Sequence, residues 1–269
     1  MTPLAIGWVV SATICLSLAL LQALTWIQRR SENSYLNFSI TAFAAAGVAL
    51  AELKMGLASS VDDFVLGFKL ANYSLAILFI ALVWFIVAYA ESQQRALAWF
   101  ATAAWFLGAI INAIRPTGLA LAEVTSLTTG TTPWGESFTI AVARTDATKL
   151  LADLGTLAVL LLAVQSCVIS WRQGQTRRAV LLGSIALFMG VALAHTTLVD
   201  LGILASPYLI SYSFVAIVVV TSYELASRVA SAATLSQRVR DDERRWRALL
   251  DGVELLVARI RSGGLIEYV

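Results

Sequence analysis

Charged residues are scarce in this sequence of 269 residues. Only 13% of the residues are charged, where a water-soluble domain usually carries about 25%, and 59% are hydrophobic. The mean hydropathy of +0.79 agrees with this balance. The composition therefore argues against a water-soluble globular enzyme and places most of the chain in lipid.

Histidine and cysteine are also scarce, which excludes several kinds of site. The one histidine, His195, cannot supply both ligands of a bis-histidine haem or form a histidine-rich metal site. Cys15 and Cys167 lie in long apolar runs and form no CxxC pattern, so we expect neither a disulfide framework nor a zinc site. The last apolar run, 207–225, has no lysine that could hold retinal as a Schiff base. We expect no metal and no cofactor.

Seven apolar stretches are long enough to cross a membrane, because a helix needs about 20 apolar residues to span about 30 Å of hydrocarbon. They predict an all-α membrane protein, a bundle of seven transmembrane helices over residues 4–27, 35–55, 64–90, 96–114, 148–171, 179–198 and 207–225. Arginines gather in the odd-numbered loops and in the C-terminal tail, whereas loop 58–63 is acidic. The positive-inside rule then predicts an external N-terminus and a cytoplasmic C-terminus.

The longest connection, residues 116–147, lies outside on this topology. Residues 137–142 alternate apolar with polar or small side chains, which is typical of a strand. The turn residues at 132–135 precede it, and 122–128 can supply a partner strand. We predict a small extracellular β-hairpin that caps the bundle, as a lid or as a structural cap.

After residue 227 the sequence becomes polar with a narrow apolar seam that includes Val229, Leu235 and Val239. This pattern predicts a cytoplasmic coiled-coil signalling helix over 228–250, which pairs two copies of the chain in parallel. The alternative is a single amphipathic helix on the inner lipid surface. Residues 251–269 then read as a strand, a Ser-Gly-Gly turn and a second strand. A two-stranded hairpin alone is only marginally stable, so we expect these residues to be the start of a further domain and the chain to stop inside it.

The segments RRWRALLDGV (244–253) and LLVARIRSGGLIEYV (255–269) resemble the opening of a PAS domain. The whole architecture resembles the N-terminal seven-transmembrane sensor region, here 1–227, of a bacterial sensor histidine kinase with a PAS domain. The resemblance implies a multi-pass protein of the bacterial inner (plasma) membrane. It also implies autophosphorylation on a histidine and transfer to a response regulator, both by an output domain that this chain lacks. This fragment itself is then no enzyme.

Several polar residues fall in the outer thirds of the predicted spans, where ionisable groups are costly and often functional. They predict a site beneath the outer loop for a small amphipathic ligand that enters from the outer leaflet, with Trp105 and Phe106 in its wall. The alternatives are an internal ion-pair network, such as Glu52 with Lys69, or side chains that snorkel to the interface. The candidate ligand-binding residues are Glu52, Lys69, Asn72, Asn112, Arg115, Asp153 and His195.

Three functions remain open from the sequence. The first is a receptor module that binds a ligand and relays a conformational change, and the second is a proton-coupled transporter or carrier. A membrane enzyme is the third, but we find no catalytic constellation, and neither GxxxxGK[ST] nor GxSxG occurs. The signalling helix and the PAS-like opening favour the receptor. We expect a lipid bilayer and a small ligand as partners, and no nucleic acid.

Overall fold

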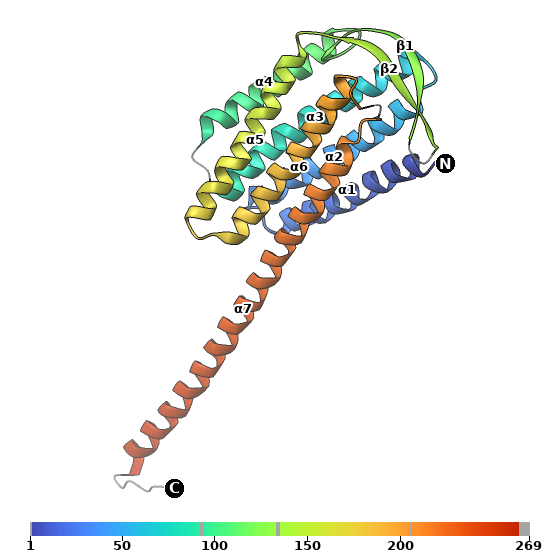
Figure 1. The fold of residues 1–269 in the computed structure, drawn as a ribbon. Coiled ribbons are helices and arrows are strands. Elements are labelled where there is room, and N and C mark those ends of the chain that lie inside the picture. Colours follow the sequence, from blue (N-terminus) through green and yellow to red (C-terminus); the bar gives the residue numbers. More distant parts are fainter. Residues whose placement is uncertain (1, 92–93, 133–134, 205, 264–269) are drawn as a thin grey trace. The chain divides into compact units, whose positions relative to one another are not determined.

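The computed structural model describes residues 2–91, 94–132, 135–204 and 206–263. It consists of helices and one two-stranded sheet: α1 (Pro3–Gln28), α2 (Asn33–Gly56), α3 (Val61–Ala90), α4 (Arg95–Ile114), β1 (Leu121–Thr131), β2 (Ser137–Thr145), α5 (Lys149–Arg172), α6 (Thr176–Asp200) and α7 (Ile210–Gly263) (Figure 1). In this described part, seven helices are long and apolar enough to cross a membrane. All seven predicted spans are confirmed as helices. The chain divides into two compact units, Met1–Ser222 and Tyr223–Val269.

Local capping explains where two of the helices begin. The Thr2 hydroxyl accepts a hydrogen bond from the Ala5 amide at 3.2 Å, and Pro3 occupies the first turn of α1. In the same way the Ser60 hydroxyl accepts from the Asp63 amide at 3.2 Å and starts α3. The two aspartates in the first turn of α3 also suit the positive end of its dipole.

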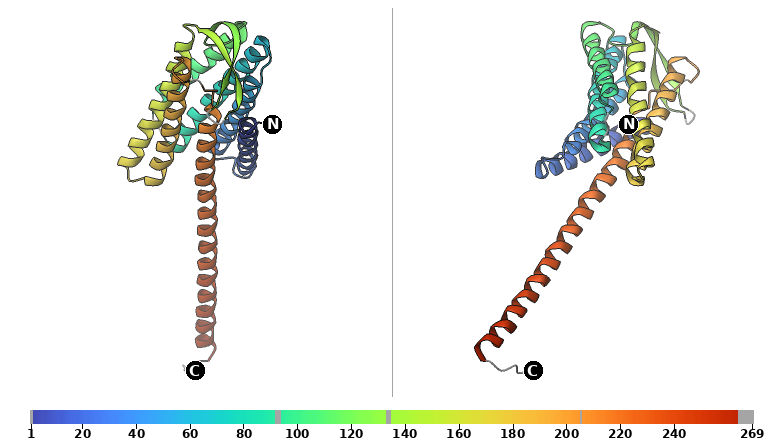
Figure 2. Two further views of the ribbon diagram at one scale, coloured as in Figure 1. Left: turned by 45° about the vertical axis from the view of Figure 1, so that its right-hand side comes forward. Right: turned by 90° about the vertical axis from the view of Figure 1, so that its left-hand side faces the viewer.

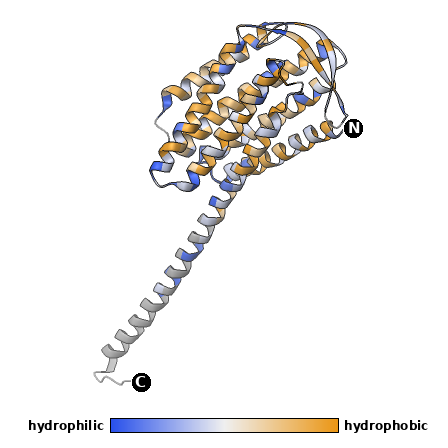
Figure 3. Ribbon diagram, in the orientation of Figure 1, coloured by the Kyte–Doolittle hydropathy of each residue, from blue (hydrophilic) through white to orange (hydrophobic). Residues whose placement is uncertain are grey.

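The first unit is a helix bundle in which sequence neighbours pack together and α3 contacts α2, α4, α5 and α6. Its interior is apolar, with Val48, Leu82 and Phe85 among the fully buried side chains. Its outer surface is apolar as well, since large side chains such as Leu20, Phe43, Leu187 and Ile114 are exposed. Hydrophobic residues predominate along the helices of this unit in Figure 3. A water-soluble bundle would carry polar residues there, so this surface fits a lipid bilayer.

The strands β1 and β2 form an antiparallel hairpin with irregularities near Glu123 and Val124. It lies across one end of the bundle in both views of Figure 2, and it is fastened there by side chains. The Thr139 hydroxyl donates to the Ala58 carbonyl at 3.0 Å, and the Leu4 amide donates to the Glu136 carboxylate at 3.0 Å. The predicted hairpin is therefore confirmed.

The second unit contains the rest of α7, which continues as a helix to Gly263. The predicted strand after residue 251 is therefore wrong, and the partner strand falls in 264–269, outside the described residues. A helix satisfies its backbone hydrogen bonds within its own segment, whereas a strand needs a neighbour. Six of the nine residues 253–261 are Leu, Arg, Ala or Glu, which are good helix formers. The parallel pairing of two copies stays a prediction.

Candidate functional site

A cavity of about 140 Å³ lies inside the first unit, at its hairpin end. One water molecule needs only about 10–15 Å³, so the space is large enough for a small organic molecule. All helices except α1 contribute to the wall, and so does the start of β1. Most of the wall is apolar, with Val48, Leu75, Phe79, Met189 and Phe214 among its residues.

A second cavity, of about 110 Å³, lies between the hairpin and the helices. Trp8, Phe64 and the β2 residues Thr139 and Ile140 line it. It adjoins the first cavity, because seven residues belong to both walls: Glu52, Met55, Phe68, Leu121, Thr145, Asp200 and Tyr208.

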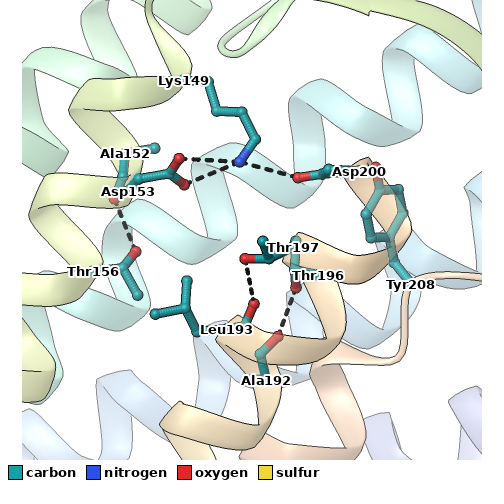
Figure 4. Close-up of polar contacts among 10 residues, drawn as sticks. All are labelled: Lys149, Ala152, Asp153, Thr156, Ala192, Leu193, Thr196, Thr197, Asp200 and Tyr208. Carbon is teal, nitrogen blue, oxygen red and sulfur yellow. Dashed lines mark hydrogen bonds and ion pairs between the residues drawn. The ribbon is translucent and has the colours of Figure 1, made fainter. Parts of the chain in front are cut away.

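The charged part of the first cavity is a cluster around Lys149 (Figure 4). The Lys149 ammonium lies 3.0 Å from an oxygen of Asp153, one turn along α5, and 3.1 Å from an oxygen of Asp200 at the end of α6. The Tyr208 hydroxyl donates to Asp200 at 2.8 Å. We call Lys149, Asp153, Asp200 and Tyr208 the lysine cluster. It joins α5, α6 and the segment before α7 around one ammonium group.

Tyr208 is a permanent donor in this cluster. Burial and, next, the negative charge of Asp200 raise the pKa of the Tyr208 hydroxyl well above its usual range. The hydroxyl therefore stays protonated in any physiological medium. Asp200 thus has two fixed partners, Lys149 and Tyr208, whereas the side chain of Asp153 is 45% exposed and keeps an open face.

Glu52 lies between the two cavities and fastens the start of α7. The residue is only 2% exposed, yet its carboxylate accepts hydrogen bonds from the Trp8 indole at 3.0 Å and from the Ile210 amide at 2.8 Å. The amide and the hydroxyl of Ser211 donate to it as well. The first amides of a helix have no partner within the helix, and its N-terminus favours a negative charge. Glu52 of α2 therefore caps α7 from outside.

Aromatic rings line the first cavity, and two side-chain nitrogens of its wall residues have no hydrogen-bond partner among the described residues. Phe79 stacks on Trp105 with ring centroids 4.6 Å apart and meets Phe214 edge-on at 5.7 Å. Asn72 and Trp105 are 9% and 3% exposed. In the part of the chain that the structure describes, Asn72 Nδ2 and Trp105 Nε1 have no hydrogen-bond partner. Most buried polar groups in proteins are paired, so these two donors are exceptions among the side chains of the wall.

Three other predicted site residues form a separate group that closes on itself. The Asn112 side chain donates to the Lys69 carbonyl and accepts from the Leu119 amide, both at 3.0 Å. The Lys69 ammonium donates to the Arg115 carbonyl at 3.0 Å. We call Lys69, Asn112 and Arg115 the loop anchor, because they hold the segment after α4 to α3.

The anchor extends to the end of the hairpin through Arg115. Its guanidinium makes two contacts with the Asp146 carboxylate, at 2.7 and 2.9 Å, and one with the Thr148 hydroxyl at 3.2 Å. The hydrogen bond from Arg115, with those from Thr148, holds the pKa of Asp146 well below its usual range. This paired geometry is the strong form of an arginine–carboxylate contact. Both ends of the hairpin segment are thus fixed.

Of the seven predicted site residues, Glu52, Asn72 and Asp153 line the cavity, whereas His195 and the three loop-anchor residues do not. The His195 ring lies 3.4 Å from the Ser206 hydroxyl. The proposed Glu52–Lys69 ion pair is wrong, because each charged group has other partners. Trp105 lines the cavity as expected, but Phe106 is 61% exposed on the outer face.

Sequence reasoning missed Lys149, Asp200 and Tyr208. The spacing of Lys149 and Asp153 at i, i+4 was the available signal, because such residues meet on one helix face. Asp200 and Tyr208 come from other segments and had no comparable signal. Among the described residues, no group of three or more His, Cys, Asp or Glu side chains could hold a metal ion.

A comparison of the sequence with protein-family models and with curated proteins found no match.

Proposed function

We propose that this chain is the membrane sensor module of a bacterial two-component receptor. It binds a small amphipathic molecule in the cavity and passes a conformational change along α7 to a cytoplasmic output domain. The observation that carries this proposal is that the first turns of α7 form part of the cavity wall. Ile210 and Phe214 line the cavity, and the helix to which they belong continues to Gly263.

The charge distribution supports the orientation that this function needs. The α1–α2 and α5–α6 connections lie at the end of the bundle opposite the hairpin (Figure 1). Arginines gather there, at Arg29, Arg30, Arg172, Arg177 and Arg178. By the positive-inside rule this end faces the cytoplasm. The hairpin, the N-terminus and the cavity then belong to the outer side of a bacterial inner membrane, with the rest of α7 inside.

A ligand changes a receptor only if it binds two conformations with different affinity. In this cavity it would contact Phe214 of α7 and the lysine cluster of α5 and α6 together. A bound molecule therefore sets the spacing between α7 and its neighbours. Two copies paired through the seam of α7 would carry that change to the output domain, which acts on a response regulator.

Filling the cavity by mutation tests this coupling without a known ligand. Ala192 and Ala194 both lie in α6, but Ala192 lines the cavity and Ala194 is exposed on the outer surface. We would place Val239→Cys in a chain whose Cys15 and Cys167 are replaced by Ala, and measure disulfide cross-linking in native membranes. We expect Ala192→Phe to change the cross-linking rate several-fold and Ala194→Phe to leave it unchanged.

Two outcomes would contradict the receptor. One is the absence of any cross-linked dimer in membranes that contain folded protein. The other is an equal effect of Ala192→Phe and Ala194→Phe, because the cavity would then have no special link to α7.

A proton-coupled carrier is the second candidate, and Glu52 is the observation that favours it. This carboxylate is buried and lines two adjoining cavities. Carriers often have helices broken near mid-membrane, however, and the spans here are continuous. In proteoliposomes with an imposed pH gradient, a carrier of protons would discharge the gradient faster with the natural chain than with Glu52→Gln. Equal decay favours the receptor.

A further inference from the structure

We infer that the cavity binds a small organic cation, an amphipathic molecule with an ammonium group, an apolar body and a hydrogen-bond acceptor. The inference deepens the proposed function and rests on it, because it names the ligand class of the same site.

The charges of the wall support a cationic ligand. Besides the neutral Tyr208, four ionisable side chains line the first cavity: Glu52, Asp153 and Asp200 are carboxylates, and Lys149 is the one ammonium among these lining residues. Glu52 is compensated by the Trp8 indole of α1 and by three donors at the start of α7. The two aspartates, in contrast, share Lys149, which leaves the lysine cluster with one negative charge in excess. A charge in a low-dielectric site attracts a counter-ion strongly.

The partners of the two aspartates indicate where the ligand charge would sit. Asp200 is 15% exposed and already holds Lys149 and Tyr208, whereas Asp153 is 45% exposed and bonds Lys149 alone. A ligand ammonium beside Asp153 would neutralise this excess, because the two aspartates would then face two cations, Lys149 and the ligand. A ligand carboxylate or phosphate would instead add to the excess of negative charge.

The rest of the wall fits the apolar part of such a molecule. Phe79, Trp105 and Phe214 present a continuous set of aromatic faces and edges. Aromatic rings pack against apolar groups and also attract ammonium ions through their quadrupole.

The unpartnered nitrogens of Asn72 and Trp105 are a second and independent observation. Each side chain is at least nine-tenths buried in the wall, and each carries a donor that lacks an acceptor in the described chain. A turn of either side chain toward the cavity would let an ether, hydroxyl or carbonyl oxygen on the ligand accept a hydrogen bond from it. The charge excess and the free donors thus describe the two ends of one ligand.

Three compounds of one shape test the inference: 2-phenoxyethylammonium, 2-phenoxyethanol and phenoxyacetate. All three keep the ring and the ether oxygen, and they differ in charge. We would titrate each into the full chain in dodecyl maltoside, a non-ionic detergent without a charged headgroup, and measure binding by calorimetry. We expect the ammonium compound to bind at least tenfold more tightly than the alcohol, and phenoxyacetate to bind most weakly.

Substitutions of Asp153 and Lys149, with a control at Asp62, test whether the preference for the ammonium compound arises in the cavity. Asp153→Asn should weaken binding of the ammonium compound about tenfold and leave the alcohol unchanged, whereas Asp62→Asn removes an exposed carboxylate outside the cavity and should change neither. Lys149→Met frees both aspartates and should strengthen binding of the ammonium compound, provided that the folded yield is retained. Equal binding of the ammonium compound and the alcohol, binding of none of the three, or equal effects of Asp153→Asn and Asp62→Asn would overturn the inference.

The cross-linking of Val239→Cys separates this inference from the proposed function. If the ammonium compound binds through Asp153 but leaves cross-linking unchanged, the ligand class stands and the receptor function fails. If 2-phenoxyethanol changes cross-linking as strongly as the ammonium compound does, the receptor stands and the ligand class fails.

Discussion

The loop anchor and the lysine cluster lie at the same end of the first unit and both consist of charged and polar side chains, but their hydrogen-bond and ion-pair partners differ. In the loop anchor, Asn112 and the Lys69 ammonium bond backbone groups of the chain itself. In the lysine cluster, two carboxylates share one ammonium beside a cavity. Buried polar groups that satisfy one another hold a fold together, whereas an unbalanced set needs a further partner. The comparison predicts that mutations in the anchor reduce stability and that mutations in the cluster change binding.

Asn112→Ala should have the largest effect on stability. Asn112 is 0% exposed, and its loss leaves the buried Leu119 amide without its acceptor. An unsatisfied buried donor and the lost side chain together should cost about 3 kcal/mol. Asn72→Ala is the matched control, because its amide nitrogen gives up no bond in the described chain, and it should cost under about 1 kcal/mol. Thermal unfolding in detergent measures both, and equal losses would remove the distinction.

Gly118→Ala should have the next largest effect on stability, because the added methyl group would lie against two side chains of the loop anchor. Gly118 has φ +82°, and an added Cβ would lie 2.6 Å from Asn112 Oδ1 and 2.9 Å from Lys69 Cγ. We expect a loss of about 2 kcal/mol from strain and displacement. Gly174 has φ +74° but open space around it, so Gly174→Ala should cost only the backbone strain, about 1 kcal/mol. A smaller loss for Gly118 than for Gly174 would show that the anchor adapts.

The ion pair between Arg115 and Asp146 should make the stability of the protein depend on pH. Contacts with Arg115 and Thr148 depress the pKa of Asp146 in the folded protein below the ordinary value of about 3.9. A depressed carboxyl pKa stabilises the fold above the unfolded pKa, and this contribution is lost as the pH falls through the folded pKa. The unfolding temperature of the natural chain should therefore drop on acidification below about pH 4. Asp146→Asn should lower it at neutral pH and reduce the further drop, whereas an unchanged pH profile would contradict this role.

Asp153→Asn should have the smallest effect on stability and thereby sharpen the comparison. Its pair with Lys149 is an i, i+4 contact with a half-exposed carboxylate, and such pairs contribute about 0.5 kcal/mol or less. We expect the unfolding temperature to stay close to that of the natural chain while binding of 2-phenoxyethylammonium falls. A large loss of folded protein from this variant would place Asp153 with the anchor instead.

The fold was largely predictable because its signals are local. Apolar length identified each of the spans, and alternation with turn residues identified the hairpin strands β1 and β2. The strand predicted after residue 251 failed, because pairing depends on a neighbour that a local pattern does not contain.

The site was predictable only in part. The depth of a residue along a span does not tell whether its side of the helix borders the cavity. Asn72 and Asn112 share residue type and depth, yet one lines the cavity and the other bonds a loop. Only the packing of α3 against α4 decides between these roles. Lys149 stands at the first residue of α5, and Asp200 approaches it from another helix, which no pattern along one span predicts.

The cap that Glu52 gives to α7 limits how the chain can be divided and recombined. The amides of Ile210 and Ser211 donate to a side chain of α2, which Trp8 of α1 also holds. The start of α7 is thus completed by residues more than 150 positions earlier in the chain. A chimaera that joins residues 210–263 to a foreign bundle would leave these amides unsatisfied unless that bundle offers a carboxylate at the same place. Such grafts should therefore be joined beyond Ser222, where the second unit begins.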